Sequence, residues 1–295
     1  MTRLIWRLFL YIVFSLSLAL FIRMLLCDFF RVPSNSMAPA VISGDFILVE
    51  KWTYGARILT SYKFERYQDP RVIRMFGIGN IHRGDVVVFN YPYRENNDNI
   101  CMNLNMRLIK RCVGIAGDSL SIVNGCYHIS ELTDTVCYVS KKISPLNYRQ
   151  ESSYKDIFPY DTTFHWNVTD FGPLLIPAAG LSISLTSRNF ILFRKLIAYE
   201  TAAKVCMKDS LVYINDSLVQ SYTFRENWYF MAGDHTANSH DSRYFGLIPE
   251  KYIIGKAFII LSSKETYTGR KRWERMMRMI TFISGNHDIY TLHTG

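Results

Sequence analysis

An uncharged apolar run close to the N-terminus is the feature that most limits how this chain can fold. Residues 8–22 contain no charged side chain, and the apolar stretch continues through residue 26 if Arg23 extends its charge towards the membrane surface. This length reaches the roughly 20 residues that a bilayer-spanning helix needs. We therefore expect a single membrane-spanning helix over residues 8–26.

A cleavable signal peptide is the alternative for the same segment, because Arg3 and Arg7 precede an apolar core of signal-like length. The residues that follow, 27–31 (CDFFR), are too bulky for a small-x-small cleavage site and favour an uncleaved anchor. Arg3 and Arg7 also favour a cytoplasmic N-terminus with the rest of the chain outside, although Arg23 and Arg31 on the other flank reduce this asymmetry.

The composition indicates a folded body behind this segment. The chain has 295 residues, of which 49% are hydrophobic and 15% aromatic, so it can bury a core in one large or two modest domains. The net charge of +9 suits either nucleic acid or an anionic membrane. A dense basic block occurs only at residues 270–272, so we expect a phospholipid membrane, and no nucleic acid, as a partner.

The six cysteines form neither a CxxC motif nor a Cys/His spacing suited to zinc, so we expect no metal and no other cofactor. If the body is exported, one pair is open to oxidation, and Cys126 and Cys137 are the pair closest in sequence. Buried free thiols are the alternative.

Runs of β-branched and aromatic residues predict a mainly β body. Residues 46–51, 86–89 and 253–261 read as strands, and Asn124-Gly125 and Asn215-Asp216 each join two short runs as a hairpin turn. A helical period without Pro or Gly predicts a helix over 190–207. Basic and apolar residues interleave over 268–283, which predicts a surface helix on anionic lipid, with a solvated tail as the alternative.

Two serines just beyond the apolar run are candidates for catalysis. Ser34 and Ser36 stand two positions apart, so their hydroxyls point the same way if the segment is extended. We expect Ser36 to act as a nucleophile, with Ser34 as a hydrogen-bond donor. A serine needs a base to remove its proton.

Lys110 is the candidate base. Alternation over residues 107–118 places it on an apolar strand face with Leu108 and Cys112. Burial can lower a lysine pKa from about 10.4 towards neutrality. The alternative is a lysine on a sheet edge whose stem only covers apolar surface. Three histidines lie in loops without a triad arrangement: His82, His235 and His240.

A loop crowded with short polar side chains follows the apolar residues 229–232. Asp241 and Arg243 within it predict an ion pair that holds the loop. Ser239 is placed to orient the lysine ammonium. Ser34 and the Ser36 backbone N–H are placed to stabilise an oxyanion.

Four stretches together resemble the bacterial type I signal peptidases, the Ser-Lys dyad serine endopeptidases also called leader peptidases. They match in the family's order, over about 29–118 and 226–263. The stretches are SNSMAP at 34–39 with GDFILVEK behind it, RGDVVVF at 83–89, KRCVGIAGD at 110–118, and GD, NS and DSRY between 233 and 244.

The resemblance implies a membrane-bound serine endopeptidase that cuts exported preproteins after small residues. It implies Ser36 as nucleophile, Lys110 as general base, and Ser34 and Ser36 as the oxyanion hole; Ser239, Asp241 and Arg243 would support them. It also implies preprotein signal peptides as partners, the secretion machinery as a further candidate partner, and a bacterial inner-membrane location with the catalytic region on the periplasmic side. The chain departs from the family at Asn35, Ala40 and His235, where glycine, threonine and asparagine are common.

The expected architecture is an antiparallel β-sheet catalytic core with a smaller inserted α+β region, preceded by one transmembrane helix. An inert or weakly active anchored β-domain that binds exported chains is the alternative function. A self-cleaving Ser-Lys regulator would need a DNA-binding module in place of the apolar run. The expected division is 1–7 cytoplasmic, 8–26 anchor, 27–118 and 226–263 catalytic core, 119–225 inserted domain, and 264–295 basic amphipathic tail.

Overall fold

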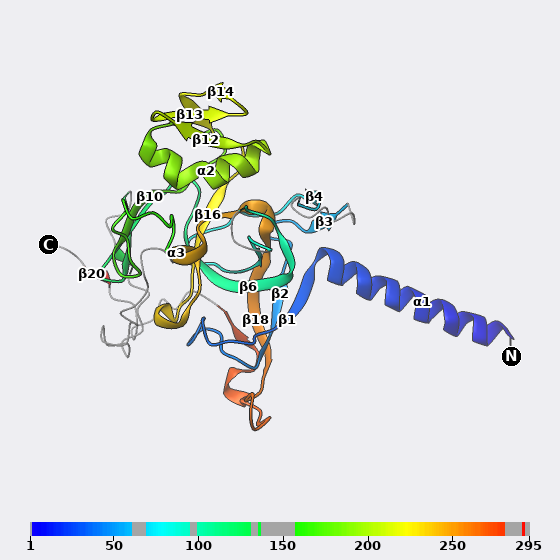
Figure 1. Ribbon diagram of the computed structural model, residues 1–295. Coiled ribbons are helices and arrows are strands. Elements are labelled where there is room, and N and C mark those ends of the chain that lie inside the picture. Colours follow the sequence, from blue (N-terminus) through cyan, green and yellow to red (C-terminus); the bar gives the residue numbers. More distant parts are fainter. Residues whose placement is uncertain are drawn as a thin grey trace.

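The N-terminal helix extends alone from a mainly β body (Figure 1). The structure is a computed structural model that describes residues 2–60, 69–94, 99–130, 135–136, 157–280 and 291–292. Helix α1 (Thr2–Leu25) is long and apolar enough to cross a membrane, and its side chains from Arg3 to Met24 are all exposed. The helix therefore begins six residues before the predicted span and ends one residue before its predicted end.

The main sheet carries the body and is antiparallel throughout its described pairs. Its strand order is β1-β2-β18-β5-β6-β16-β17, with β19 also pairing with β18. Three predicted runs form its interior strands β2, β5 and β18, which confirms the mainly β, antiparallel core. The strands are β1 (Cys27–Arg31), β2 (Asp45–Glu50), β5 (Val86–Tyr91), β6 (Asn103–Gly114), β16 (Trp228–Ala232), β17 (Ile248–Pro249), β18 (Ile253–Ser263) and β19 (Arg278–Met279).

Strand β6 is buried on both faces over its second half. Residues 110–114 are all buried, so the alternation predicted for this strand does not appear as alternating exposure. Two core clusters explain this burial, because Val87 and Cys112 belong to one and Val86 and Val88 to the other. Both faces of a strand that lies between two cores are shielded from water.

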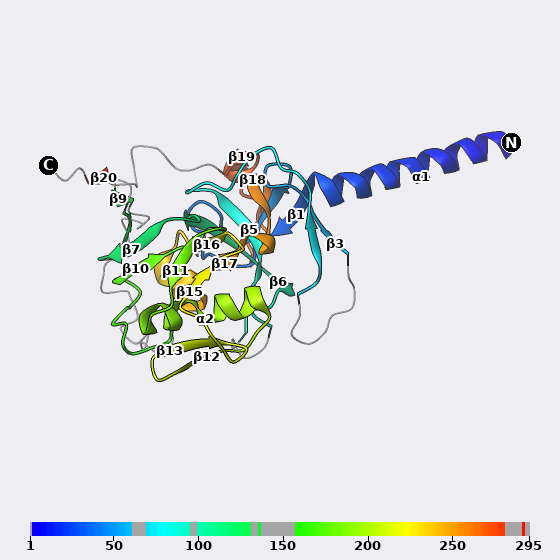
Figure 2. The ribbon, with the colours of Figure 1, turned by 90° about the horizontal axis from the view of Figure 1, so that it is seen from above.

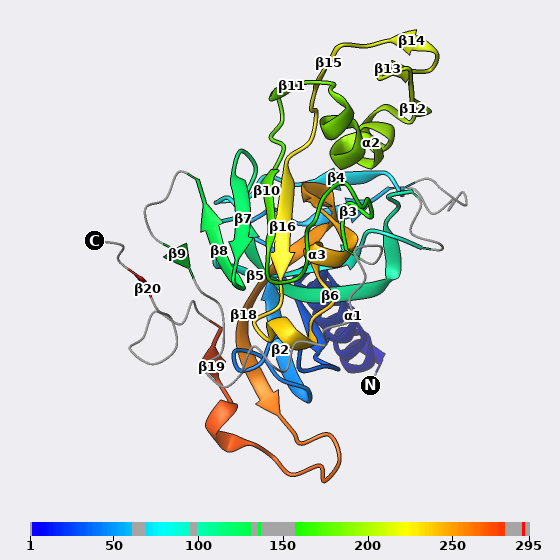
Figure 3. The same cartoon turned by 60° about the vertical axis from the view of Figure 1, so that its left-hand side comes forward.

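The described residues of the 119–225 region form several small sheets and the helix α2, which lies beside β12 and β13 (Figures 2 and 3). Asn124 and Gly125 both adopt positive φ between β7 and β8, as do Asn215 and Asp216 between β13 and β14, which confirms both predicted hairpins. These elements are β7 (Ser119–Val123), β8 (Cys126–Ile129), β9 (Thr135–Val136), β10 (Phe171–Leu175), β11 (Ser182–Ser184), α2 (Ser187–Thr201), β12 (Val205–Lys208), β13 (Leu211–Ile214), β14 (Ser217–Leu218), β15 (Ser221–Thr223) and β20 (Thr291–Leu292).

Helix α2 is shorter than predicted. Thr186 caps its start by accepting a hydrogen bond from the Asn189 N–H at 3.2 Å. Ala202 adopts a left-handed conformation with φ 52° and ends it. The residues expected to continue the helix form β12, which pairs with β13, so cross-strand pairing determines their structure. Two further short strands, β3 (Arg57–Leu59) and β4 (Val72–Arg74), pair with each other as a separate two-stranded sheet.

The segment after β18 is not the predicted surface helix. Lys264 and Lys271 form a β-bridge, a short 3₁₀ turn η5 (Trp273–Arg275) follows, and β19 pairs with β18. Ile280 is buried in a core cluster. The helix prediction is therefore wrong through residue 280, because strand pairing and burial return this segment to the main sheet; residues 281–283 lie outside the described part.

The described cysteines include both a disulfide-bonded residue and free thiols. Cys126 is disulfide-bonded, whereas Cys137, its predicted partner, lies outside the described residues. Cys27, Cys101 and Cys112 are buried free thiols, and Cys206 is free and partly exposed.

Candidate active site

The two candidate serines lie on the loop between β1 and β2, which we call the nucleophile loop (residues 32–44). The chain bends at Asn35 and turns from Ser36 onwards, so the predicted continuous extended segment through both serines is wrong. The two hydroxyl oxygens nevertheless lie 3.4 Å apart. Met37 explains how Ser36 is held, because its fully buried side chain packs in a core cluster with Val32 and Val41. Ser36 is thereby placed, half-buried, at the rim of that core.

Lys110 reaches Ser36 from the main sheet. It lies on β6 opposite Val87 of β5, and its Nζ donates a hydrogen bond to Ser36 Oγ at 2.7 Å. Strand β6 lies between β5 and β16, and Lys110 is only 3% exposed, so it is neither an edge lysine nor one whose ammonium reaches water.

Burial changes the proton affinity of this amine. Desolvation lowers the pKa of Lys110 to about 8, against the opposing attraction of Asp241, while Arg243 adds to the decrease. At pH 7 about a tenth of a group with such a pKa is neutral, compared with a negligible fraction of an ordinary lysine. The arrangement therefore supplies a free amine lone pair next to a serine hydroxyl near neutral pH.

Asp241 and Arg243 form a fully buried pair in the loop after β16, which we call the polar loop (residues 233–246). Arg243 donates from Nε and Nη2 to the two carboxylate oxygens at 2.9 and 2.8 Å, and from Nη2 to the Thr236 carbonyl. Burial alone would raise the pKa of Asp241, but Arg243 and the Gly233 N–H lower it overall. The carboxylate is therefore ionised and fixes the loop, with α3 (Ser242–Phe245) and the 3₁₀ turn η3 (Thr236–Asn238) on either side.

Ser239 lies close to the nucleophile loop without binding Lys110. Its buried Oγ has no hydrogen-bond partner among the described residues. Gly233 brings the two loops together, because a Cβ there would lie 2.2 Å from Ser239 Oγ and 2.5 Å from the Ser36 carbonyl oxygen. His235 contributes through its backbone, whose N–H donates to the same carbonyl at 3.0 Å.

The other two candidate histidines lie in different surroundings. The His240 ring stacks on Tyr244 with centroids 5.1 Å apart, and burial lowers the pKa of His240. His82 Nδ1 lies 3.9 Å from Asp85. Among the described contacts none joins either histidine to Ser36, so Lys110 is the base that the geometry provides.

A buried ion pair beside Lys110 was not predicted from the sequence. Arg111 donates from Nε and Nη2 to both oxygens of Asp234 at 2.7 and 2.5 Å. The pair joins β6 to the first residues of the polar loop, so it fixes Lys110 relative to Ser239 and Asp241. Arg111 follows Lys110 directly and Asp234 follows Gly233, both within stretches that resemble the family, but nothing in the sequence shows that these two residues meet across 123 positions.

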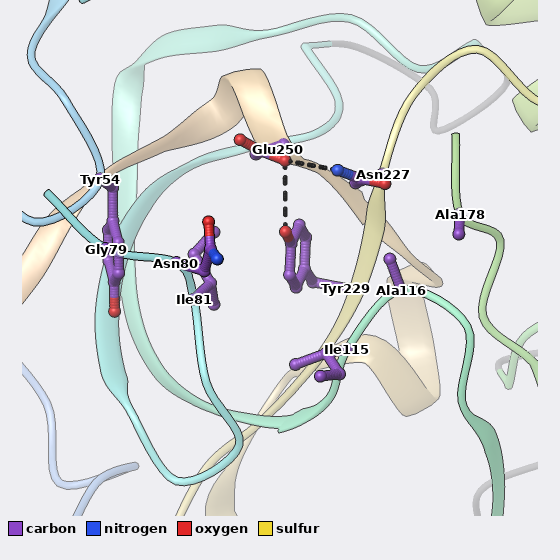
Figure 4. A pocket seen from close by; sticks show the side chains of 10 residues that line it. All are labelled: Tyr54, Gly79, Asn80, Ile81, Ile115, Ala116, Ala178, Asn227, Tyr229 and Glu250. Carbon is purple, nitrogen blue, oxygen red and sulfur yellow. Dashed lines mark hydrogen bonds between the residues drawn. The ribbon is translucent and has the colours of Figure 1, made fainter. Parts of the chain in front are cut away.

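A pocket of about 390 Å³ lies apart from these residues (Figure 4). Glu250, in the 3₁₀ turn η4 (Glu250–Tyr252), accepts hydrogen bonds there from Asn227 and Tyr229. Neither Ser36 nor Lys110 lines it. Among the described residues, no group of three or more His, Cys, Asp or Glu side chains is arranged to hold a metal ion.

Comparison with known proteins identifies the family. The family model for signal peptidase, peptidase S26, matches residues 5–262. Signal peptidase I of Buchnera aphidicola subsp. Baizongia pistaciae is 30% identical over 83% of this chain and 73% of its own length. Signal peptidase I of Aquifex aeolicus is 28% identical over 83% and 79%, and that of Rickettsia felis 27% identical over 92% and 83%. The chain therefore belongs to the signal peptidase family, peptidase S26, and is a serine peptidase hydrolase.

Proposed function

We propose that this protein removes N-terminal signal peptides from exported preproteins, with Ser36 as the nucleophile and Lys110 as its general base. Signal peptide removal follows from the family. The single observation that carries the residue assignment is the 2.7 Å contact between Lys110 Nζ and Ser36 Oγ, made by a lysine that is 3% exposed. Such a contact is what an activated serine requires.

The reaction proceeds in two halves. Neutral Lys110 takes the Ser36 hydroxyl proton while Oγ attacks the scissile carbonyl carbon, and the resulting tetrahedral intermediate carries its negative charge on the former carbonyl oxygen. Collapse of the intermediate breaks the C–N bond, and Lys110 gives its proton to the departing amine. Lys110 then takes a proton from water while the water oxygen attacks the carbonyl carbon of the Ser36 ester. The C–Oγ bond breaks, Lys110 returns the proton to Ser36 Oγ, and the carboxylic acid product leaves.

The intermediate oxygen is stabilised by the Ser34 hydroxyl and the Ser36 backbone N–H. The Ser34 hydroxyl lies 3.4 Å from the Ser36 hydroxyl, which supports this assignment because it places a donor next to the carbonyl that Ser36 attacks. Ser239, Asp241 and Arg243 support Lys110 from the polar loop: the ion pair keeps the loop rigid, and Ser239 orients the amine when substrate is bound.

Helix α1 anchors the catalytic body to the bacterial inner membrane, with the body on the periplasmic side. Exposed apolar side chains around the body end of α1 support this: Trp52 and Phe258 contact each other edge to face, and Phe76 and Ile78 are 96% and 77% exposed. The Lys51 N–H donates to the carbonyl of Leu26, and the Ile78 N–H donates to that of Trp52, so Trp52 and Ile78 lie close to the end of the span. They are suited to enter the lipid surface.

Cleavage of a preprotein by the full chain in lipid vesicles tests the proposal. Ser36→Ala should abolish turnover, and Lys110→Met should lower kcat by at least about 10²–10⁴-fold, the usual contribution of a general base. Ser217→Ala and Lys208→Met are matched controls, because both residues are exposed and lie in the β12–β14 sheet. Cleavage by Ser36→Ala at the parent rate would overturn the assignment. A binding domain without activity would show no turnover in the parent either.

A further inference from the structure

We propose that Arg275 is a positioning residue that fixes the nucleophile loop and thereby places Ser36 in reach of Lys110. This inference rests on the proposed role of Ser36. The segment carrying Arg275 lies about 240 positions further along the chain, beyond the four stretches that resemble the family, and packs against the nucleophile loop.

The Arg275 side chain holds the turn that follows Ser36. It is 9% exposed, and it donates from Nε and Nη2 to the two carboxylate oxygens of Asp45 at 3.2 and 2.7 Å. It also donates to the backbone carbonyls of Pro39 and Ala40, at 3.4 and 3.0 Å. Asp45 is fully buried and accepts from the Ile42 N–H at 2.9 Å. One guanidinium therefore connects both ends of residues 39–45.

Ser43 provides a second connection between the same two segments. Arg272 Nη1 donates to the Ser43 carbonyl at 3.0 Å, and the Ser43 hydroxyl lies 3.0 Å from that of Thr266. The same hydroxyl donates to the Pro33 carbonyl, and the Ser43 N–H donates to Asn35 Oδ1 at 2.9 Å. The two arms of the nucleophile loop are thus joined to each other on either side of Ser36. The Asn35 side-chain amide, at a position where the family commonly has glycine, accepts one of these connecting hydrogen bonds.

The segment that carries Arg275 is itself held by the main sheet. The Met277 N–H donates to the Ile260 carbonyl at 2.7 Å, and β19 pairs with β18. The sheet also carries Lys110 on β6. Arg275 therefore ties the nucleophile loop to the same framework as its base. Misplacing a reacting group by about 1 Å can cost about 100-fold in rate, so this connection bears on catalysis.

The test compares three variants of the full chain in lipid vesicles. Arg275→Met removes the charge and the donors, and Arg275→Lys keeps the charge. Arg278→Met is the matched control, because Arg278 is an exposed residue of β19. We expect Arg275→Met to lower kcat by about 10- to 100-fold at little change in KM. Arg275→Lys should recover part of the loss. The pH midpoint of the rate should stay at the parent value, because the surroundings of Lys110 are unchanged.

A measurement independent of activity separates this proposal from the role of Ser36. In chains that also carry Ser36→Ala, hydrogen exchange at the amides of Val41, Ile42 and Ser43 reports the loop, since each donates a hydrogen bond within the loop or to Asp45 at its end. Arg275→Met should speed this exchange by at least about tenfold over Arg278→Met. Parent-like exchange, or a kcat equal to that of the control, would overturn the proposal.

Arg272→Met provides a milder variant in case Arg275→Met does not fold. It removes the donor to the Ser43 carbonyl and leaves the buried Asp45 pair in place. Arg272→Met and Arg275→Lys should then both speed exchange at Ser43 and lower kcat by a few-fold. If both match Arg278→Met in exchange and kcat, Arg275 is a structural residue only. If Ser36→Ala alone retains cleavage, the proposed function is wrong while the exchange result stands.

Discussion

Burial of the Lys110 side chain changes the proton affinity of the amine that contacts Ser36. Desolvation at 3% exposure lowers the pKa of this amine to about 8, so a side chain that is fully protonated in water is partly neutral near pH 7. Asp241 opposes this decrease and Arg243 supports it. The two charges of this buried ion pair act on the pKa of Lys110 in opposite directions, so desolvation remains the dominant effect on it.

Ser34 provides a test of the oxyanion assignment. Ser34→Ala should lower kcat by about 10²–10³-fold while KM changes little, because the lost donor acts on charge that develops only in the transition state. Ser34→Thr keeps a hydroxyl at this exposed position and should retain much more activity. Steady-state cleavage of a preprotein measures both. An alanine variant as active as the threonine variant would contradict the assignment.

Arg243 tests the buried pair. Arg243→Met leaves the fully buried Asp241 carboxylate without its cation, so we expect the free energy of unfolding to fall by about 3–5 kcal/mol. Glu226→Gln is the contrasting change, because Glu226 and its partner Lys251 are each about a third exposed. A surface pair of that kind contributes about 0–1 kcal/mol. Urea unfolding compares the two, and equal losses would show that the Asp241–Arg243 pair does not hold the fold.

At the scale of elements, the sequence predicted correctly those turns and strands whose structure depends on their own residues. Asn124-Gly125 predicted its hairpin because two positive φ angles suit those residues, and the run at 86–89 predicted an interior strand. The segment 268–280 was misassigned because its basic and apolar residues fit an amphipathic helix equally well. It instead pairs with β18, and Arg275 binds Asp45, which lies 230 positions earlier in the chain, so neither contact is visible in the local pattern.

The apolar segment after β4 tests how the body meets the membrane. In a body of residues 29–295, which lacks α1, the double change Phe76→Ser with Ile78→Ser should lower partition onto anionic lipid vesicles by at least about tenfold, since burying each side chain is worth about 1.5–3 kcal/mol. The control pair is Leu211→Ser with Leu218→Ser, which are also exposed but lie in the β12–β14 sheet. Vesicle sedimentation measures the partition. Equal binding by the two variants would contradict this docking surface.

At the scale of the whole molecule, the main sheet and its loops bring together residues that the chain keeps far apart. Ser36, Lys110 and Asp241 were identified from the sequence as parts of one site, and the structure places Lys110 against Ser36 and Asp241 within electrostatic reach of Lys110. The connections that hold them were not identified. Arg111 with Asp234, and Arg275 with Asp45, are pairs whose members have no local pattern linking them.

The pH dependence of kcat/KM for preprotein cleavage tests the central claim most directly, because it reports the protonation of the free enzyme's base. In the proposed mechanism Lys110 must lose its proton to act, and its pKa of about 8 lies below the ordinary lysine value. We therefore expect kcat/KM to rise about tenfold per pH unit up to a midpoint near this pKa and to level off above it. Activity that is undiminished well below neutrality would show that Lys110 is not the base.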